Sequence, residues 1–96
     1  MADVVYKSPL GVSIYDDKES YDCFSITGNP KEKETIVEFD SAYDFEEFIQ
    51  KHINCKGIEF DSEFCQFFAY AKTRERALKF VNDIEKHFEK VKKMLD

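Results

Sequence analysis

The segment "GIEFDSEFCQFFAYAK", residues 57–72, decides how the chain folds. Its first residues alternate as in a β-strand, with Ile58 and Phe60 on one face and Glu59 and Asp61 on the other. The triplet "DSE" that follows forms either a tight turn between two strands or a bulge within one long strand. The segment therefore predicts at least one strand, directly before the C-terminal quarter of the chain.

In the second half of this segment, residues 64–71, apolar side chains occupy both faces of the predicted strand. Such a strand is covered on both sides, or it is a central strand whose outer face meets another molecule. The small side chains of Ala69 and Ala71 would let a helix approach closely. We therefore expect one face to belong to the core and the other to form a second layer or an interface.

Two amphipathic helices flank this region. Ser41 is a suitable N-cap for a helix over about 42–54, and Thr73 is a suitable N-cap for a second helix over roughly 74–95. The second helix would be on the order of 33 Å long, whereas a strand of five or six residues is roughly 20 Å long. We therefore expect its C-terminal end to overhang the sheet.

The first forty residues contain short, alternating, β-rich runs. Residues 3–6 can begin a strand, and clearer alternation predicts strands at 11–15, 21–27 and 35–39. The five residues 16–20, "DDKES", suit the loop of a hairpin. Three antiparallel strands in a meander are the simplest expectation.

Together these elements predict an α+β fold in the order β-β-β-α-β-α, with a small antiparallel sheet covered by two helices, of which the C-terminal one is long. The length of 96 residues suits a single domain spanning 1–96. The strand order stays open, because the strand after the first helix can join either edge or the centre of the sheet.

The composition narrows the protein class. The chain is 43% hydrophobic and 35% charged, with a net charge of −6, too apolar for intrinsic disorder and too charged for a membrane protein. The acidic balance disfavours direct nucleic-acid binding, which depends on Lys and Arg. The N-terminal residues lack the features of a secretory signal, and three cysteines indicate reduced thiols. We therefore expect a cytoplasmic protein, in the host cell's cytoplasm if it is viral.

No residue pattern points to catalysis or to a metal. Cys23 or Cys65 would need His52 or His87 within hydrogen-bond reach to act as a nucleophile, and His87 is expected to be a solvated helix residue. The set His52, Cys55 and Cys65 lacks the fourth ligand of a structural zinc site. We therefore expect no enzyme activity, no cofactor and no metal site.

The charge is unevenly distributed along the chain. Residues 58–71 carry three acids and no base, whereas residues 72–96 carry eight bases and five acids. Glu59, Asp61 and Glu63 would share one strand face. The simplest interpretation is a solvated edge strand whose charges discourage pairing, and the alternative is an electrostatic binding site for a cation or a basic partner.

The leading hypothesis is a non-enzymatic protein-binding protein, an acidic inhibitor or mimic that acts on a basic partner surface. Its predicted partner-binding residues are Tyr15, Tyr21, Glu59, Asp61 and Glu63. Complementary charge would speed association, and tyrosine rings would anchor the complex. By analogy of size and composition only, phage anti-defence proteins and toxin-neutralising immunity proteins work in this way.

A second hypothesis places an anion at the start of the last helix. Thr73, Arg74 and Arg76 could hold a phosphate-bearing small ligand or nucleotide, because a helix N-terminus attracts anions. The competing interpretation is that these bases pair with the acids of the preceding strand, which would neutralise them within the fold. We favour the internal pairing.

A third hypothesis is self-assembly through the overhanging end of the last helix. Val91, Met94 and Leu95 keep this end apolar, and an apolar overhang favours contact with a partner helix. We therefore expect a homodimer, whatever else the protein binds.

Overall fold

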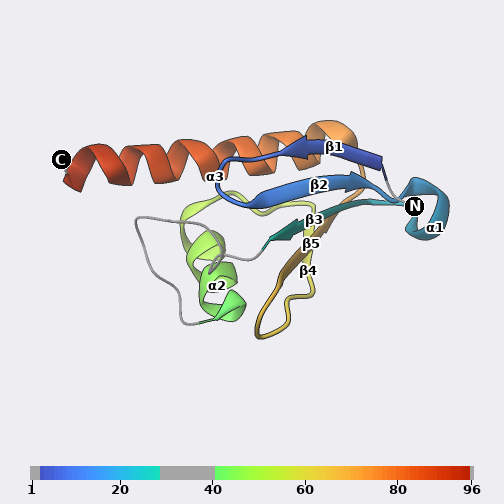
Figure 1. Cartoon of the computed structure of the whole chain (residues 1–96), viewed down its shortest axis with the longest axis horizontal. Coiled ribbons are helices and arrows are strands. Elements are labelled where there is room, and N and C mark those ends of the chain that lie inside the picture. The colour runs from blue at the N-terminus through green and yellow to red at the C-terminus, as the bar shows by residue number, and fades with distance from the viewer. Residues whose placement is uncertain (1–2, 29–40, 96) are drawn as a thin grey trace.

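The computed structural model describes residues 3–28 and 41–95, with side chains described for 3–28 and 41–90. It is an α+β fold with an antiparallel sheet, as predicted, and the sheet has five strands (Figure 1). The strands are β1 (Asp3–Lys7), β2 (Val12–Asp16), β3 (Phe24–Gly28), β4 (Ile58–Phe60) and β5 (Phe67–Ala71). The helices are α1 (Lys18–Tyr21), α2 (Ala42–His52) and α3 (Arg74–Leu95). The strand predicted at 35–39 lies outside the described residues.

The strands follow one another across the sheet in the order β1-β2-β3-β5-β4. The strand region after α2 therefore enters the sheet beside β3 and ends at the edge with β4. Continuous cross-strand pairing aligns Ile14, Ile26, Ala69 and Phe60 in one row. Since side chains alternate between the faces of a strand, this row defines one face of the sheet from β2 to β4.

The hydrophobic core lies on this face, under α2 and α3. Phe67, Ala69 and Ala71 of β5 are all buried, and the two small residues leave room for α3 to approach. Burial of a side chain such as Phe67 stabilises the fold by roughly 1.5–3 kcal/mol. Figure 1 shows α3 running past the sheet, so that its C-terminal turns extend beyond α2, as predicted. The prediction that one face of 64–71 belongs to the core is confirmed for β5.

The cap predicted for the first helix is present. Ser41 Oγ accepts a hydrogen bond from the Asp44 backbone N–H at 3.3 Å, and the buried face of α2 carries Phe45 and Ile49. The helix ends where Ile53 turns to an extended conformation. No helix in the described part of the chain combines the length and the apolar character needed to cross a membrane.

The hairpin between β2 and β3 differs from the predicted five-residue loop. Residues 18–21 form the short helix α1, closed by a 2.8 Å hydrogen bond from the Tyr21 N–H to the Asp17 carbonyl. Asp22 then adopts a left-handed conformation with φ 54°, which ends α1 and turns the chain back. Because this excursion takes up residues 17–23, β3 begins at Phe24 and not at residue 21 as predicted.

The "DSE" triplet is a turn between two antiparallel strands and not a bulge in one. The Asp61 N–H donates to the Phe68 carbonyl at 3.0 Å, and the Glu63 N–H donates to the Gln66 carbonyl at 2.9 Å. Since β4 ends at Phe60, the prediction that three acids share one strand face is wrong: Glu59 is on the strand, whereas Asp61 and Glu63 belong to the turn.

Candidate partner-binding groove

The second face of the sheet, opposite the core, carries a row of polar and aromatic residues. Cross-strand pairing places Tyr15 of β2 opposite Ser25 of β3, Ser25 opposite Tyr70 of β5, and Tyr70 opposite Glu59 of β4. Side chains paired directly across an antiparallel sheet have Cβ atoms about 5 Å apart. The row therefore sets Tyr70 between the carboxylate of Glu59 and the β3 position Ser25.

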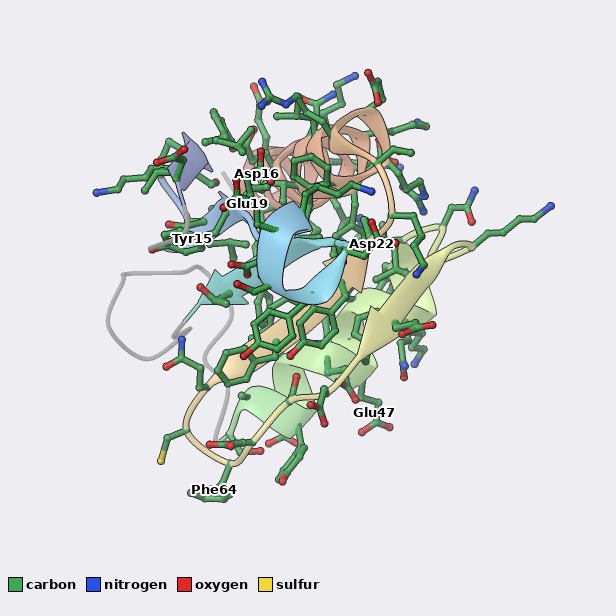
Figure 2. All side chains as sticks on the ribbon, turned by 90° about the vertical axis from the view of Figure 1, so that its right-hand side faces the viewer. Tyr15, Asp16, Glu19, Asp22, Glu47 and Phe64 are labelled. Atoms are coloured by element: carbon green, nitrogen blue, oxygen red, sulfur yellow. The ribbon has the colours of Figure 1, made fainter. Side chains whose placement is uncertain are left out.

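A groove with a volume of about 470 Å³ lies over this row. We call it the tyrosine groove. It is lined by residues of the sheet, of the α1 connection and of the positions just before β4 and just after β5: Tyr15, Asp17, Tyr21, Cys23, Ser25, Thr27, Gly57, Glu59, Phe68, Tyr70, Ala71 and Lys72. Figure 2 looks onto this end of the molecule, with α1 in front of the sheet, Tyr15 beside it, and Asp16, Glu19 and Asp22 around it.

The α1 connection positions the carboxylate of Asp17 in the tyrosine groove. Ser25 Oγ donates a hydrogen bond to Asp17 Oδ2, and the Asp17 N–H donates to the Cys23 carbonyl at 3.1 Å. These two contacts hold Asp17 above β3. Tyr21, at the end of α1, is 75% exposed and stands at the rim of the groove.

The tyrosine groove is electronegative. Its lining contains the acids Asp17 and Glu59 and one base, Lys72. Burial raises the pKa of the Tyr70 phenol, and the nearby Asp61 carboxylate raises it further. Burial and then the Asp17 carboxylate likewise raise the pKa of the Cys23 thiol. Burial disfavours a charge of either sign, whereas the contributions of Asp61 and Asp17 disfavour a further negative charge only, so a charged group that enters the groove is better a cation than an anion.

Three of the five predicted partner-binding residues line the groove, namely Tyr15, Tyr21 and Glu59. Asp61 and Glu63 do not line it, because the β4–β5 turn carries them away from the strand row. Asp61 nevertheless acts on Tyr70 through its charge.

Sequence reasoning did not select Asp17 or Tyr70 as site residues. Tyr70 could have been selected from the sequence, because it lies on the second apolar face of residues 64–71, which was expected to form a second layer or an interface. Phe68 shares that face and also lines the groove. Asp17 had no such signal, since its position depends on α1 and on a hydrogen bond to a residue eight positions later.

The basic start of α3 makes contacts within the fold. Thr73 Oγ1 caps the helix by accepting from the Arg76 N–H at 3.1 Å. Arg74 lies 4.0 Å from Asp16 Oδ2 and packs over the Phe24 ring. The sequence favoured pairing of these bases with the acids of residues 58–71. Among the described residues this pairing does not occur, and Arg74 contacts Asp16 of β2 instead.

Arg76 binds backbone oxygens at the end of α2. Its Nε donates to the Lys56 carbonyl and its Nη2 to the Asn54 carbonyl, both at 2.7 Å. Its Nη1 is buried without a hydrogen-bond partner among the described residues. The predicted anion site at the start of α3 stays untested. The guanidinium groups of Arg74 and Arg76 that would form it already have contacts inside the fold.

The two histidines lie together between α2 and α3, and His87 is not the solvated residue that was expected. The ring centroids of His52 and His87 are 4.7 Å apart with the rings inclined by 23°, and the Phe48 ring packs beside both. Burial lowers the pKa of His87, and the neighbouring His52 and Lys90 lower it further. The pair is therefore a packing contact between the helices.

The remaining predicted features lie apart from the groove or outside the described side chains. Val91, Met94 and Leu95 fall in the last turns of α3, outside the residues whose side chains are described. All three cysteines are free thiols, and no cluster of three or more metal-ligating side chains occurs in residues 3–28 and 41–90. Comparisons of the chain with protein-family models, with curated proteins and with solved structures find no match.

Proposed function

We propose that the chain is a non-enzymatic protein-binding protein that places its tyrosine groove against a basic surface of a partner protein. The observation that carries this proposal is the sheet face opposite the core, where Tyr15, Tyr21 and Tyr70 line one groove with the carboxylates of Asp17 and Glu59. Within residues 3–28 and 41–95, helices α2 and α3 pack on the other face, which leaves the tyrosine groove accessible to a partner.

The chemistry of the groove suits protein recognition. Tyrosine offers a large, rigid ring with a polar end, and such side chains are enriched at the energetic centres of interfaces. Tyr15 and Tyr70 are half-buried, so the fold holds their rings before any partner arrives, whereas Tyr21 presents an exposed ring at the rim. The net charge of −6 would steer the chain toward a basic surface and speed association.

We further propose that binding inhibits the partner by covering its basic surface. Small acidic inhibitors of the phage anti-defence and immunity-protein kind act in this way, and the analogy rests on size and charge. The three free thiols fit a reducing compartment, so we place the interaction in the cytoplasm.

A capture experiment with matched tyrosine variants tests the proposal. The tagged chain is incubated with nuclease-treated lysate of its native host, and captured proteins are identified by mass spectrometry. Tyr21→Ala removes a ring from the groove rim, whereas Tyr43→Ala removes a ring that is 51% exposed on α2, outside the groove. Glu59→Gln and Glu47→Gln form the corresponding pair for charge, with Glu47 exposed on α2 (Figure 2).

The expected result is one stoichiometric protein partner that is retained by Tyr43→Ala and Glu47→Gln and lost or reduced with Tyr21→Ala and Glu59→Gln. Its capture should weaken as salt is raised, because exposed charge pairs are screened. A partner that binds all four variants equally would refute the placement of the interface on the tyrosine groove.

A further inference from the structure

We infer that the tyrosine groove receives an arginine side chain of the partner protein. This inference rests on the proposed function and adds the chemical identity of the group that enters the groove. Its basis is the placement of carboxylates on both sides of an aromatic ring, in a cavity of about 470 Å³ that is open to solvent at the rim near Tyr21. Ligand-binding cavities commonly have volumes of roughly 300–1,000 Å³, so a side chain fits with room to spare.

The first step of the argument is the position of the two carboxylates. Glu59 lies on β4, directly opposite Tyr70, and Asp17 is held over β3 by its hydrogen bond from Ser25. Neighbouring strands are about 4.8 Å apart, so β3 and β4, with β5 between them, are separated by about 10 Å. The two anions therefore flank the Tyr70 ring on opposite sides.

The second step is that these carboxylates are not neutralised by ion pairs. Within the described part of the chain, Lys18 pairs with Asp22 at 3.5 Å and Arg74 with Asp16 at 4.0 Å, and Lys72, the one base in the groove lining, forms no ion pair with either carboxylate. Asp17 accepts a hydrogen bond from a neutral hydroxyl, which leaves its charge in place. The charge that complements the groove is therefore a cation.

The third step is the choice of arginine over lysine. A guanidinium group is planar and carries five N–H donors, so it can stack on an aromatic ring and donate to carboxylates in its own plane. The groove offers aromatic faces from Tyr15, Phe68 and Tyr70 as well as two carboxylates. An ammonium group would gain the charge but not the stacking. Lys72 also lines the groove, but its side chain is exposed to solvent, so the groove remains accessible to the guanidinium group.

The test uses the peptide acetyl-Gly-Arg-Gly-amide as the probe and follows backbone amide resonances of the whole chain by ¹H–¹⁵N NMR. The matched peptides replace arginine by citrulline, which is neutral and of the same shape, or by lysine. We expect the arginine peptide to shift resonances of groove residues, with at least tenfold weaker binding of citrulline and weaker binding of lysine. Glu59→Gln should weaken arginine binding several-fold, whereas Glu47→Gln should leave it unchanged.

The outcomes separate this inference from the proposed function. Three outcomes would overturn the inference. They are equal binding of the arginine and citrulline peptides, shifts confined to residues outside the groove, and no shift at the highest peptide concentration that stays in solution. If Tyr21→Ala nevertheless abolishes capture of the partner protein, the proposed function stands although the inference about arginine is wrong. If the arginine peptide binds the groove but the partner binds every variant, the inference about the groove holds and the proposed interface is wrong. A dispersed spectrum for each variant shows that it is folded.

Discussion

The Tyr6 hydroxyl donates a 2.6 Å hydrogen bond to Glu85 Oε1 and so joins the edge strand β1 to the middle of α3. Among the strands that the structure describes, β1 pairs only with β2, and this pairing is irregular between Val4 and Tyr6. This contact therefore links the first strand to the last helix across 79 positions of sequence.

Tyr6→Phe should lower the free energy of unfolding by about 1 kcal/mol, the usual net value of one hydrogen bond. The hydrogen bond to Glu85, followed by burial and the Glu85 charge, raises the pKa of Tyr6. The contribution is therefore complete below the unfolded-state pKa of about 10 and is lost as the pH rises through the higher folded-state pKa. Urea unfolding of wild type and variant at pH 7 and pH 10.5 measures this, with Tyr43→Phe as control. An equal loss in both variants would contradict the role of Glu85.

Neighbouring residues Phe67 and Phe68 lie on opposite faces of β5 and should give opposite results. Phe67 is fully buried, with its ring centroid 5.0 Å from that of Phe45, so Phe67→Ala should cost about 3–5 kcal/mol of stability. Phe68 is half-buried in the tyrosine groove, so Phe68→Ala should cost much less and should weaken partner binding instead. Urea unfolding together with the capture assay separates the two effects. Similar destabilisation by both substitutions would show that the second face is also core.

The sequence predicts the parts of this fold that depend on local signals. The cap at Ser41, the amphipathic stripe of α3 and the apolar character of residues 67–71 are each readable within a few residues, and each is present. The short helix α1 is not readable in this way, because four residues provide no hydrophobic period.

The tyrosine groove was predictable only in part, because its geometry depends on register between distant strands. Tyr15 and Tyr21 are recognisable as amphipathic side chains, but the pairing of Glu59 with Tyr70 requires the hairpin turn that follows β4. The position of Asp17 requires contact with Ser25. Strand order and register follow from packing of the whole sheet, which single-residue patterns do not encode.

Arg76 should be more important for stability than the other bases at the start of α3. Its guanidinium donates 2.7 Å hydrogen bonds to two carbonyls of the α2–β4 connection, whereas Arg74 is exposed and has a 4.0 Å ion pair with Asp16 and a contact with the Phe24 ring. We expect Arg76→Ala to cost about 1–2 kcal/mol and Arg74→Ala less than about 0.5 kcal/mol, since exposed ion pairs contribute little. Thermal unfolding of both variants measures the difference.

The same two variants test the alternative anion site. If phosphate-bearing ligands stabilise the wild type and the effect disappears with Arg74→Ala, a variant that stays folded, the start of α3 binds anions. If nucleotides and inorganic phosphate leave the unfolding temperature unchanged up to 10 mM, a concentration about ten times a Kd of about 1 mM, the basic residues serve the fold alone. Equal destabilisation by the two substitutions would contradict the role assigned to the Arg76 hydrogen bonds.

The stacked histidines between α2 and α3 should make stability depend on pH near neutrality. Burial, then His52 and Lys90, lower the pKa of His87, so the unfolded chain takes up a proton first as the pH falls. The free energy of unfolding should therefore decline as the pH drops below about 6.5 and level off below the folded-state pKa of His87. Urea unfolding between pH 5.5 and 7.5 should show this decline in wild type and a smaller one in His87→Gln. His52→Gln removes one neighbouring imidazole but leaves His87 buried, so its decline in stability should be intermediate. An unchanged pH dependence in His87→Gln would assign the decline to other groups.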